Sequence, residues 1–352
     1  MTDSAIQLLS RLIATPSISR EESGTADIIY EWLKERGVDP KRHHNNVWAV
    51  APGYDPAKKT LLLNSHHDTV RPASGYTRDP FKPDIENGCL YGLGSNDAGA
   101  SAVCLASVFC ELIRNPLPYN LILALTAEEE VTGEKGMRAV LPHIEEKGYR
   151  IDMGIVGEPT SLQPAVGERG LVVLDCTARG KSGHAARGEG INAIYKAVDD
   201  INILRNFKFE KESELLGPIS VTVTQINAGK QHNVVPDECN FVVDVRTTDA
   251  YSNEETVEIL RDAISSEANP RSTRLRASVI PADHPLVEIC RELGMTPFVS
   301  PTMSDMAVMN GFPTLKIGPG DSSRSHTADE FIRLDEISAG IETYMNILKR
   351  LK

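Results

Sequence analysis

Short apolar runs alternate with amphipathic segments through the first half of the chain. The apolar runs predict strands, and the amphipathic segments predict helices. Ser4 is the expected cap of the first helix, and Gly37 is the expected stop of the second. The predicted order is helix 4–12, helix 21–36, strand 47–51, strand 61–65, helix 99–114, strand 121–125, helix 134–147 and strand 153–156. This alternation is typical of an α/β sheet layered by helices.

A second pattern begins after Gly167-Glu168-Arg169-Gly170. It predicts strand 171–179, helix 190–206, strand 219–227, strand 238–247, helix 253–267 and strand 274–280. That β-α-β-β-α-β order is the split, ferredoxin-like pattern. The first pattern then resumes with helix 285–293, strand 314–317 and helix 334–351. The sequence therefore predicts one domain, 171–280, inserted into another made of 1–170 and 281–352.

Size and composition are those of an ordinary globular protein. The 352 residues exceed the size at which a single core keeps growing, which favours two domains. The formal charge of −12 argues against nucleic-acid and anionic-membrane partners. No apolar stretch reaches the roughly 20 residues that cross a bilayer, and Met1 to Ser4 lacks the features of a secretory signal. Six scattered cysteines are expected to be reduced thiols, so a cytoplasmic location is predicted.

Polar residues follow the apolar runs at widely separated positions. Residues at the carboxyl ends of strands in an open α/β sheet meet at one crevice. Imidazoles and carboxylates gathered there without cysteine favour a divalent cation, with Zn²⁺ first and Co²⁺ as an alternative. The number of groups suits two ions that share a bridging carboxylate. The residues concerned are His66, Asp97, Glu129, Glu130, Glu158 and His326.

Each of these residues also has an ordinary explanation when it is taken alone. Asp97 follows a glycine-rich turn and is suited to cap a helix, and the acidic run after Thr126 is suited to begin one. Asp68 lies two positions after His66, which places both side chains on one face of a strand. Asp68 is therefore expected to bond the far nitrogen of His66 and fix its tautomer. His67 is expected to take no part.

Five motifs of this chain occur in the order found in one enzyme family. The chain resembles the dinuclear-zinc deacylases and peptidases that include acetylornithine deacetylase, succinyl-diaminopimelate desuccinylase, aminoacylase and carboxypeptidase G. The similarity extends over essentially the whole chain. The motifs are Ser65-His66-His67-Asp68-Thr69-Val70, Tyr91-Gly92-Leu93-Gly94-Ser95-Asn96-Asp97, Thr126-Ala127-Glu128-Glu129-Glu130, Gly157-Glu158-Pro159-Thr160 and Ser325-His326-Thr327-Ala328-Asp329-Glu330.

The resemblance implies a zinc exopeptidase-like mixed sheet layered by helices, with an inserted ferredoxin-like α+β domain that serves as lid and dimerisation domain. It implies that His66 and Glu158 hold one ion and that Glu130 and His326 hold the other. Asp97 would bridge the two ions, and its peptide bond to Ala98 would be cis. The remaining glutamate, Glu129, would be the general base for attack by a metal-bridging water.

The resemblance also assigns roles inside the inserted domain. His184 would reach the active site of the other subunit of a homodimer and stabilise the oxyanion. Asn233 and Arg246 would hold the substrate, and the guanidinium of Arg246 suits a carboxylate.

The expected activity is hydrolysis of the amide of a small N-acyl-amino acid. The first candidate is deacetylation of N-acetyl-ornithine in arginine biosynthesis. Alternatives are an N-acetyl- or N-succinyl-citrulline deacylase, a succinyl-diaminopimelate desuccinylase, a dipeptidase, and a metal-binding relative without catalysis. Relatives often carry Gly-Thr before the Ser-Asp pair, whereas this chain has Thr302-Met303 before Ser304-Asp305. Arg71, Arg78 and Arg324 flank the metal motifs and are candidates to receive a second anionic group.

Overall fold

The computed structural model describes residues 1–352, which fold into two compact units. The larger unit consists of Met1–Val166, Ile280–Val299 and Ser304–Lys352, and the smaller consists of Gly167–Val279 and Ser300–Met303. Each unit has a hydrophobic core of its own.

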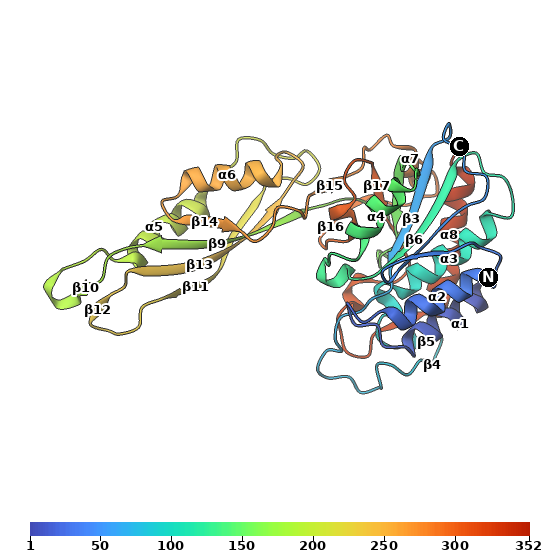
Figure 1. Ribbon diagram of the computed structural model, residues 1–352, viewed down its shortest axis with the longest axis horizontal. Coiled ribbons are helices and arrows are strands. Elements are labelled where there is room, and N and C mark those ends of the chain that lie inside the picture. The colour runs from blue at the N-terminus through green and yellow to red at the C-terminus, as the bar shows by residue number, and fades with distance from the viewer. The chain divides into compact units, whose positions relative to one another are not determined.

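The larger unit is built on a mixed sheet (Figure 1). The sheet has the strand order β1-β2-β6-β3-β7-β17-β8-β15, with β16 paired to β8 off this path. Strand β15 and the last two residues of β8 are counted with the smaller unit. The fold class is α/β, as predicted. The strands are β1 (Lys41–His43), β2 (Asn46–Val50), β3 (Thr60–His66), β6 (Asn120–Thr126), β7 (Met153–Val156), β8 (Ala165–Glu168), β15 (Ser278–Val279), β16 (Phe298–Ser300) and β17 (Thr314–Lys316).

The centre of this sheet is parallel. Strand β3 runs parallel to β6 and to β7, and β17 runs parallel to β7. Because parallel strands end at the same edge, the residues that follow His66, Thr126 and Val156 emerge together. The three motifs on these strands are therefore brought side by side by the topology.

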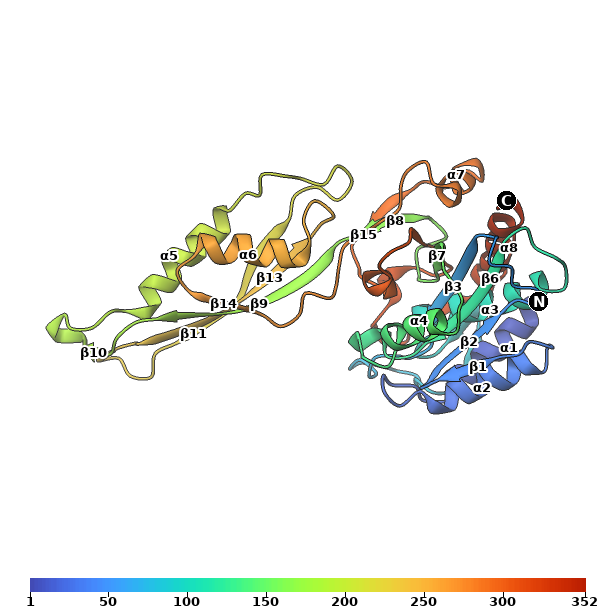
Figure 2. The ribbon, with the colours of Figure 1, turned by 45° about the horizontal axis from the view of Figure 1, so that its top comes forward.

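Helices cover both faces of the sheet (Figure 2). Neighbouring residues of a strand point to opposite faces, so Leu61 and Leu63 join one core cluster while Leu62 joins another. Helices α1, α2, α3, α7 and α8 pack in the first cluster, and α4 packs in the second. The helices are α1 (Thr2–Ile13), α2 (Ser23–Lys34), α3 (Ala100–Leu112), α4 (Met137–Glu146), α7 (Pro285–Glu292) and α8 (Leu334–Arg350).

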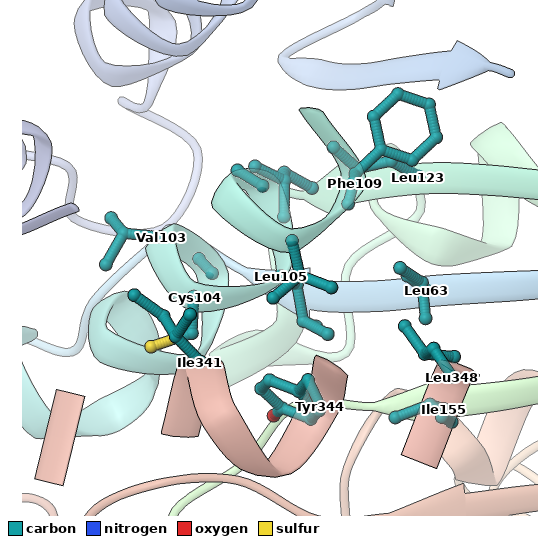
Figure 3. Close-up of a cluster of buried hydrophobic side chains, with 14 of the residues drawn as sticks. Leu63, Val103, Cys104, Leu105, Phe109, Leu123, Ile155, Ile341, Tyr344 and Leu348 are labelled. Carbon is teal, nitrogen blue, oxygen red and sulfur yellow. The ribbon is translucent and has the colours of Figure 1, made fainter. Parts of the chain in front are cut away.

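Helix α3 is buried on nearly every side, which explains why its sequence is apolar all round. Figure 3 shows its residues Leu105 and Phe109 in one cluster of buried side chains with Leu123 of β6 and Tyr344 of α8. The hydroxyl of Tyr344 donates to the Ile317 carbonyl at 2.6 Å, which satisfies this polar atom inside the core. This packing fixes the start of α3, three residues after Asp97.

A small antiparallel sheet, in the order β18-β5-β4, joins two distant motifs. It consists of β4 (Asp84–Glu86), β5 (Cys89–Tyr91) and β18 (Phe331–Arg333). The pairing of Tyr91 with Phe331 places the turn that leads to Asp97 beside the segment that follows His326.

The smaller unit has a four-stranded antiparallel sheet in the order β11-β13-β9-β14. Alternate residues of β9 are buried, so one face of this sheet packs against the two helices. The elements are β9 (Gly170–Arg179), β10 (Gly183–His184), α5 (Ala193–Asn206), β11 (Ser220–Ala228), β12 (Val234–Val235), β13 (Glu238–Thr247), α6 (Asn253–Ala263) and β14 (Glu267–Pro270). The order of strands and helices is the predicted β-α-β-β-α-β pattern.

Two local predictions were wrong. Ser4 does not cap the first helix, which begins at Thr2; its hydroxyl instead accepts a hydrogen bond from Arg36. The fourth strand of the inserted sheet is β14, not residues 274–280. A charged residue and a proline hide β14 in the sequence, whereas the more apolar segment that was chosen supplies only the two-residue strand β15.

None of the helices combines the length and the apolar character that crossing a membrane requires.

Candidate metal centre and active site

Asp97 lies between two histidines of the larger unit. Its Oδ1 is 3.2 Å from Nε2 of His66, and its Oδ2 is 3.7 Å from Nε2 of His326. The Asp97–Ala98 peptide bond is cis, as the family resemblance predicts. A carboxylate that presents one oxygen to each imidazole has the arrangement required to bridge two cations.

The other carboxylates complete two half-sites around Asp97. Nε2 of His326 lies 3.1 and 3.0 Å from the two oxygens of Glu130. Nε2 of His66 lies 3.7 Å from Glu158 Oε1 and 4.0 Å from Glu129 Oε2. Glu129 and Glu130 belong to one short 3-10 turn, Glu129–Val131, which follows β6 after two intervening residues, and their side chains approach different histidines.

The donor set fits divalent cations. His66, Asp97 and Glu130 each offer a ligand atom within 4.8 Å of the others. Imidazole nitrogens and carboxylate oxygens without thiolate are suited to Zn²⁺ and similar ions. Bound cations would also offset the mutual repulsion of several carboxylates held in one partly buried site. The residues therefore fit a pair of metal ions.

The pKa values of the cluster reflect this crowding. Burial, followed by repulsion from Asp97 and Glu130, raises the pKa of Glu158 to about 8, although His66 opposes the shift. Burial also raises the pKa of Glu129 well above its ordinary value, with Glu158 adding to the effect. The hydrogen bonds with Glu130 raise the pKa of His326 to about 9. Bound cations would favour the ionised forms of Glu158 and Glu129.

Asp68 lies behind the centre and is fully buried. Its backbone carbonyl is 3.0 Å from Nδ1 of His66, whereas the carboxylate is 3.5 Å from the same nitrogen. That carboxylate accepts the backbone N–H of Glu129 at 3.1 Å and of Glu130 at 3.3 Å, and the Ser19 hydroxyl donates to it at 2.6 Å. The sequence predicted contact with His66 but not the support that Asp68 gives to the two glutamates.

Three further residues next to the centre were missed as participants. Glu330 accepts three backbone N–H groups of the turn that carries Asp97. Asn96 exchanges hydrogen bonds with the backbone of Asp321, and its side-chain nitrogen lies 3.4 Å from the Ser325 hydroxyl. Asp305 accepts the hydroxyl of Thr126 at 2.7 Å, and burial raises its pKa to about 6. Each of these three residues lies within or next to a sequence motif. The spacing of residues in the sequence does not show which distant groups their side chains bond.

Other polar residues near the motifs have structural partners. Both ring nitrogens of His67 are occupied, one by Thr25 and the other by the Asn45 carbonyl, as expected for a residue outside the centre. Arg78 pairs with Asp84 and Glu86. Arg324 forms a bidentate pair with Glu336 at 2.7 and 3.1 Å. These two arginines are engaged within the chain, whereas Arg71 is exposed.

The remaining predicted residues lie in the inserted unit. His184 is exposed on β10, and its Nδ1 accepts the N–H of Ala186 at 3.2 Å. Asn233 is adjacent, because its carbonyl accepts the N–H of Ala185 at 3.0 Å. The guanidinium of Arg246 holds Asp244 at 2.8 and 3.1 Å. The fork predicted for a substrate carboxylate is thus occupied by a neighbouring aspartate in this structure.

The fold and the clustered donors are those of a metallohydrolase. The chain belongs to peptidase family M20/M25/M40, whose model matches residues 62–350. It is 28% identical over 373 residues to an acetylornithine deacetylase of Shigella sonnei, covering 97% of this chain and 96% of that protein.

Solved structures share the fold at lower identity. The aminopeptidase PepT of Bacillus cereus superposes with a TM-score of 0.78 at 18% identity, covering 99% of this chain and 98% of that one. A metallo-carboxypeptidase of Sulfolobus solfataricus gives 0.73 at 20% identity and 99% coverage of both chains. A dinuclear metal-binding peptidase of Bacillus subtilis gives 0.75 at 16% identity, again over 99% of both.

Proposed function

We propose that the protein hydrolyses the amide of an N-acyl-amino acid, with N-acetyl-ornithine as the first candidate substrate. The observation that carries the proposal is Asp97 between His66 and His326, with Glu129 beside the same centre. The relative of S. sonnei supports the acetylornithine assignment, because its similarity covers both units of the chain. The match with solved peptidases supports the fold alone.

The metal-binding residues in this proposal are the predicted ones. His66 and Glu158 would hold one cation, Glu130 and His326 would hold the other, and Asp97 would be shared between them. Bound divalent cations supply a lowered pKa for an attacking water and polarise the scissile carbonyl. Zn²⁺ is the first choice because the donors are imidazoles and carboxylates.

Glu129 moves the proton in the reaction. Its carboxylate takes a proton from the attacking water and passes it to the amide nitrogen as the C–N bond breaks. The products are the free amino acid and the acyl carboxylate. Glu129 suits this role because Oε2 is 4.0 Å from His66 Nε2, farther than the nearest oxygens of Asp97 and Glu158. Asp68 holds the backbone of Glu129 and so orients it.

The proposal also includes a homodimer that forms through the inserted domain. In this dimer His184 acts on the substrate bound by the partner subunit, and Asn233 and Arg246 bind the substrate. The support is an unpaired edge and an apolar surface. Strand β11 is at the edge of its sheet, where Ile226 is 54% exposed. On α5, Tyr195 is 70% exposed and Val198 is 43% exposed. Unpaired sheet edges and exposed apolar side chains are often buried when two protein subunits associate.

The experiment that tests this function is a product assay over a small panel. The Zn²⁺-loaded enzyme is given N-acetyl- and N-succinyl-ornithine, the corresponding citrulline derivatives, N-succinyl-diaminopimelate and a dipeptide, and release of acetate, succinate or amino acid is measured. The proposal expects the highest kcat/KM for N-acetyl-ornithine, with Glu129→Gln as the inactive control. A preference for a succinyl compound would reassign the acyl group, and a preference for the dipeptide would overturn the deacylase proposal.

A further inference from the structure

The carboxylate of Glu330 is enclosed by the backbone of the turn that precedes Asp97. Its Oε1 accepts the N–H of Asn96 at 2.8 Å and of Asp97 at 2.9 Å, and its Oε2 accepts the N–H of Gly94 at 3.0 Å. The Glu330 carbonyl also accepts the N–H of Gly92 at 2.9 Å. Backbone N–H groups of one turn that converge in this way form a binding site for an anion, which here is a side chain of the same protein.

The turn needs this acceptor because most of it is buried. Glu330 is 2% exposed, and Asn96 is fully buried. Buried N–H groups without an acceptor are costly, and the oxygens of Glu330 supply acceptors for three of them. Gly94 adopts φ +76°, and a Cβ there would meet the side chain of Thr69 at 2.6 Å. The turn therefore requires glycine at position 94 to adopt this backbone conformation.

The same contacts join Asp97 to the segment that carries His326. Glu330 lies four positions after His326, so its side chain ties that segment to the N–H of Asp97 itself. The Asn96 side chain adds a second connection, with Nδ2 donating to the Asp321 carbonyl and Oδ1 accepting the Asp321 N–H, both at 3.0 Å. The two connections lie on either side of His326 in the sequence.

We propose that Glu330 is a positioning residue that fixes the Asp97 turn against the His326 segment and so preforms the spacing of the two metal half-sites. Its oxygens already accept three N–H groups, so it acts through Asp97 rather than as a ligand. This inference rests on the proposed role of Asp97 as the bridging ligand. Outer partners of this kind typically change metal affinity by about 10–100-fold.

The test uses Zn²⁺ alone, with affinity measured by competition with a chelator. Glu330→Gln keeps the shape of the side chain but turns an NH₂ group toward an N–H donor. The expected result is Zn²⁺ binding weakened by about 10–100-fold. The matched control is Asp200→Asn in the inserted unit, where a buried carboxylate accepts the N–H groups of Ser265 and Ser266. This control should lose thermal stability but bind Zn²⁺ within twofold of wild type. Zn²⁺ affinity of Glu330→Gln within twofold of wild type would overturn the proposal.

Hydrogen exchange of the metal-free wild type provides a test that does not depend on a variant that folds. The amides of Gly94, Asn96 and Asp97 should be protected before any metal is added. Protection that appears only after Zn²⁺ binds would show that metal, not Glu330, orders the turn, and would overturn the proposal. Failure of Asp97→Ala to reduce Zn²⁺ binding would instead contradict the proposed metal site, so the two failures are distinguishable.

Discussion

The carboxylate of Asp68 accepts the backbone N–H of Glu129 at 3.1 Å. One oxygen of this buried group supports Glu129, and the other lies 3.3 Å from the N–H of Glu130 and 2.6 Å from the Ser19 hydroxyl. Asp68 thus controls where both glutamates emerge from the strand that precedes them. A side chain expected to orient a histidine also orients the proposed base.

Asp68→Asn should therefore reduce kcat by about 10–100-fold, because the amide NH₂ group opposes one of the backbone donors. The measurement is steady-state kinetics together with metal content. Ser19→Ala is the milder comparison variant, because it removes one hydrogen bond to Asp68 but leaves the acceptor of both backbone N–H groups in place. Its kcat should fall by less than tenfold. Wild-type kcat in Asp68→Asn would contradict this role.

Glu129 and Glu130 provide a pair of adjacent variants with opposite expectations. Glu129→Gln should retain both metals and lose about 10²–10⁴-fold in kcat, because it removes general acid–base catalysis. Glu130→Gln should lose metal, because its oxygens face His326 at 3.0 and 3.1 Å. Metal analysis after gel filtration and the kcat of the reloaded proteins provide the measurement. The opposite pattern would exchange the roles of the two residues.

Much of the larger unit could be predicted from the sequence, because the candidate ligands closely follow apolar strands. The runs before His66, Glu129 and Glu158 became parallel neighbours, so a pattern of apolar segments followed by polar residues located the cluster of candidate ligands. The support from Glu330 was not predictable, since its three bonds reach backbone groups more than two hundred positions away. Strand β14 was missed because pairing with β9, not its own composition, makes it a strand.

Subunit exchange should reveal whether His184 acts on the partner's site. His184→Ala should reduce kcat by about 10²–10³-fold with metal content unchanged, if it donates to the oxyanion. Mixing it with Glu129→Ala should restore part of the activity, because a heterodimer has one site with both wild-type groups. Each variant mixed with itself is the control. Failure to complement, or a fully active monomer, would contradict a role across the dimer.

A histidine cluster away from the centre should make stability depend on pH. The rings of His43 and His143 stack with centroids 4.0 Å apart, and His44 lies beside His43. Burial, followed by the charges of His143 and His44, lowers the pKa of His43, although Glu146 opposes the shift and Lys147 adds to it. At this position the unfolded chain then binds more protons than the native one, so the contribution of His43 to stability falls as pH drops through about 6.5.

His143→Phe keeps the stacked ring and removes its charge, so the stability of this variant relative to wild type should rise as pH is lowered from 7.5 to 5. Urea unfolding of the metal-free proteins across this range gives the comparison. His232→Phe, on an exposed loop of the inserted unit, is the control and should follow wild type. Identical slopes for His143→Phe and wild type would show that the stack does not contribute.

The most direct test of the central claim is the number of metal ions bound per chain. Metal-free protein is equilibrated with excess Zn²⁺, freed of unbound metal by gel filtration and analysed for zinc and protein. The account predicts two ions per wild-type chain and a loss from both half-sites in Asp97→Ala, because Asp97 faces His66 and His326. One ion or none in the wild type, or two ions retained by Asp97→Ala, would contradict a dinuclear centre bridged by Asp97.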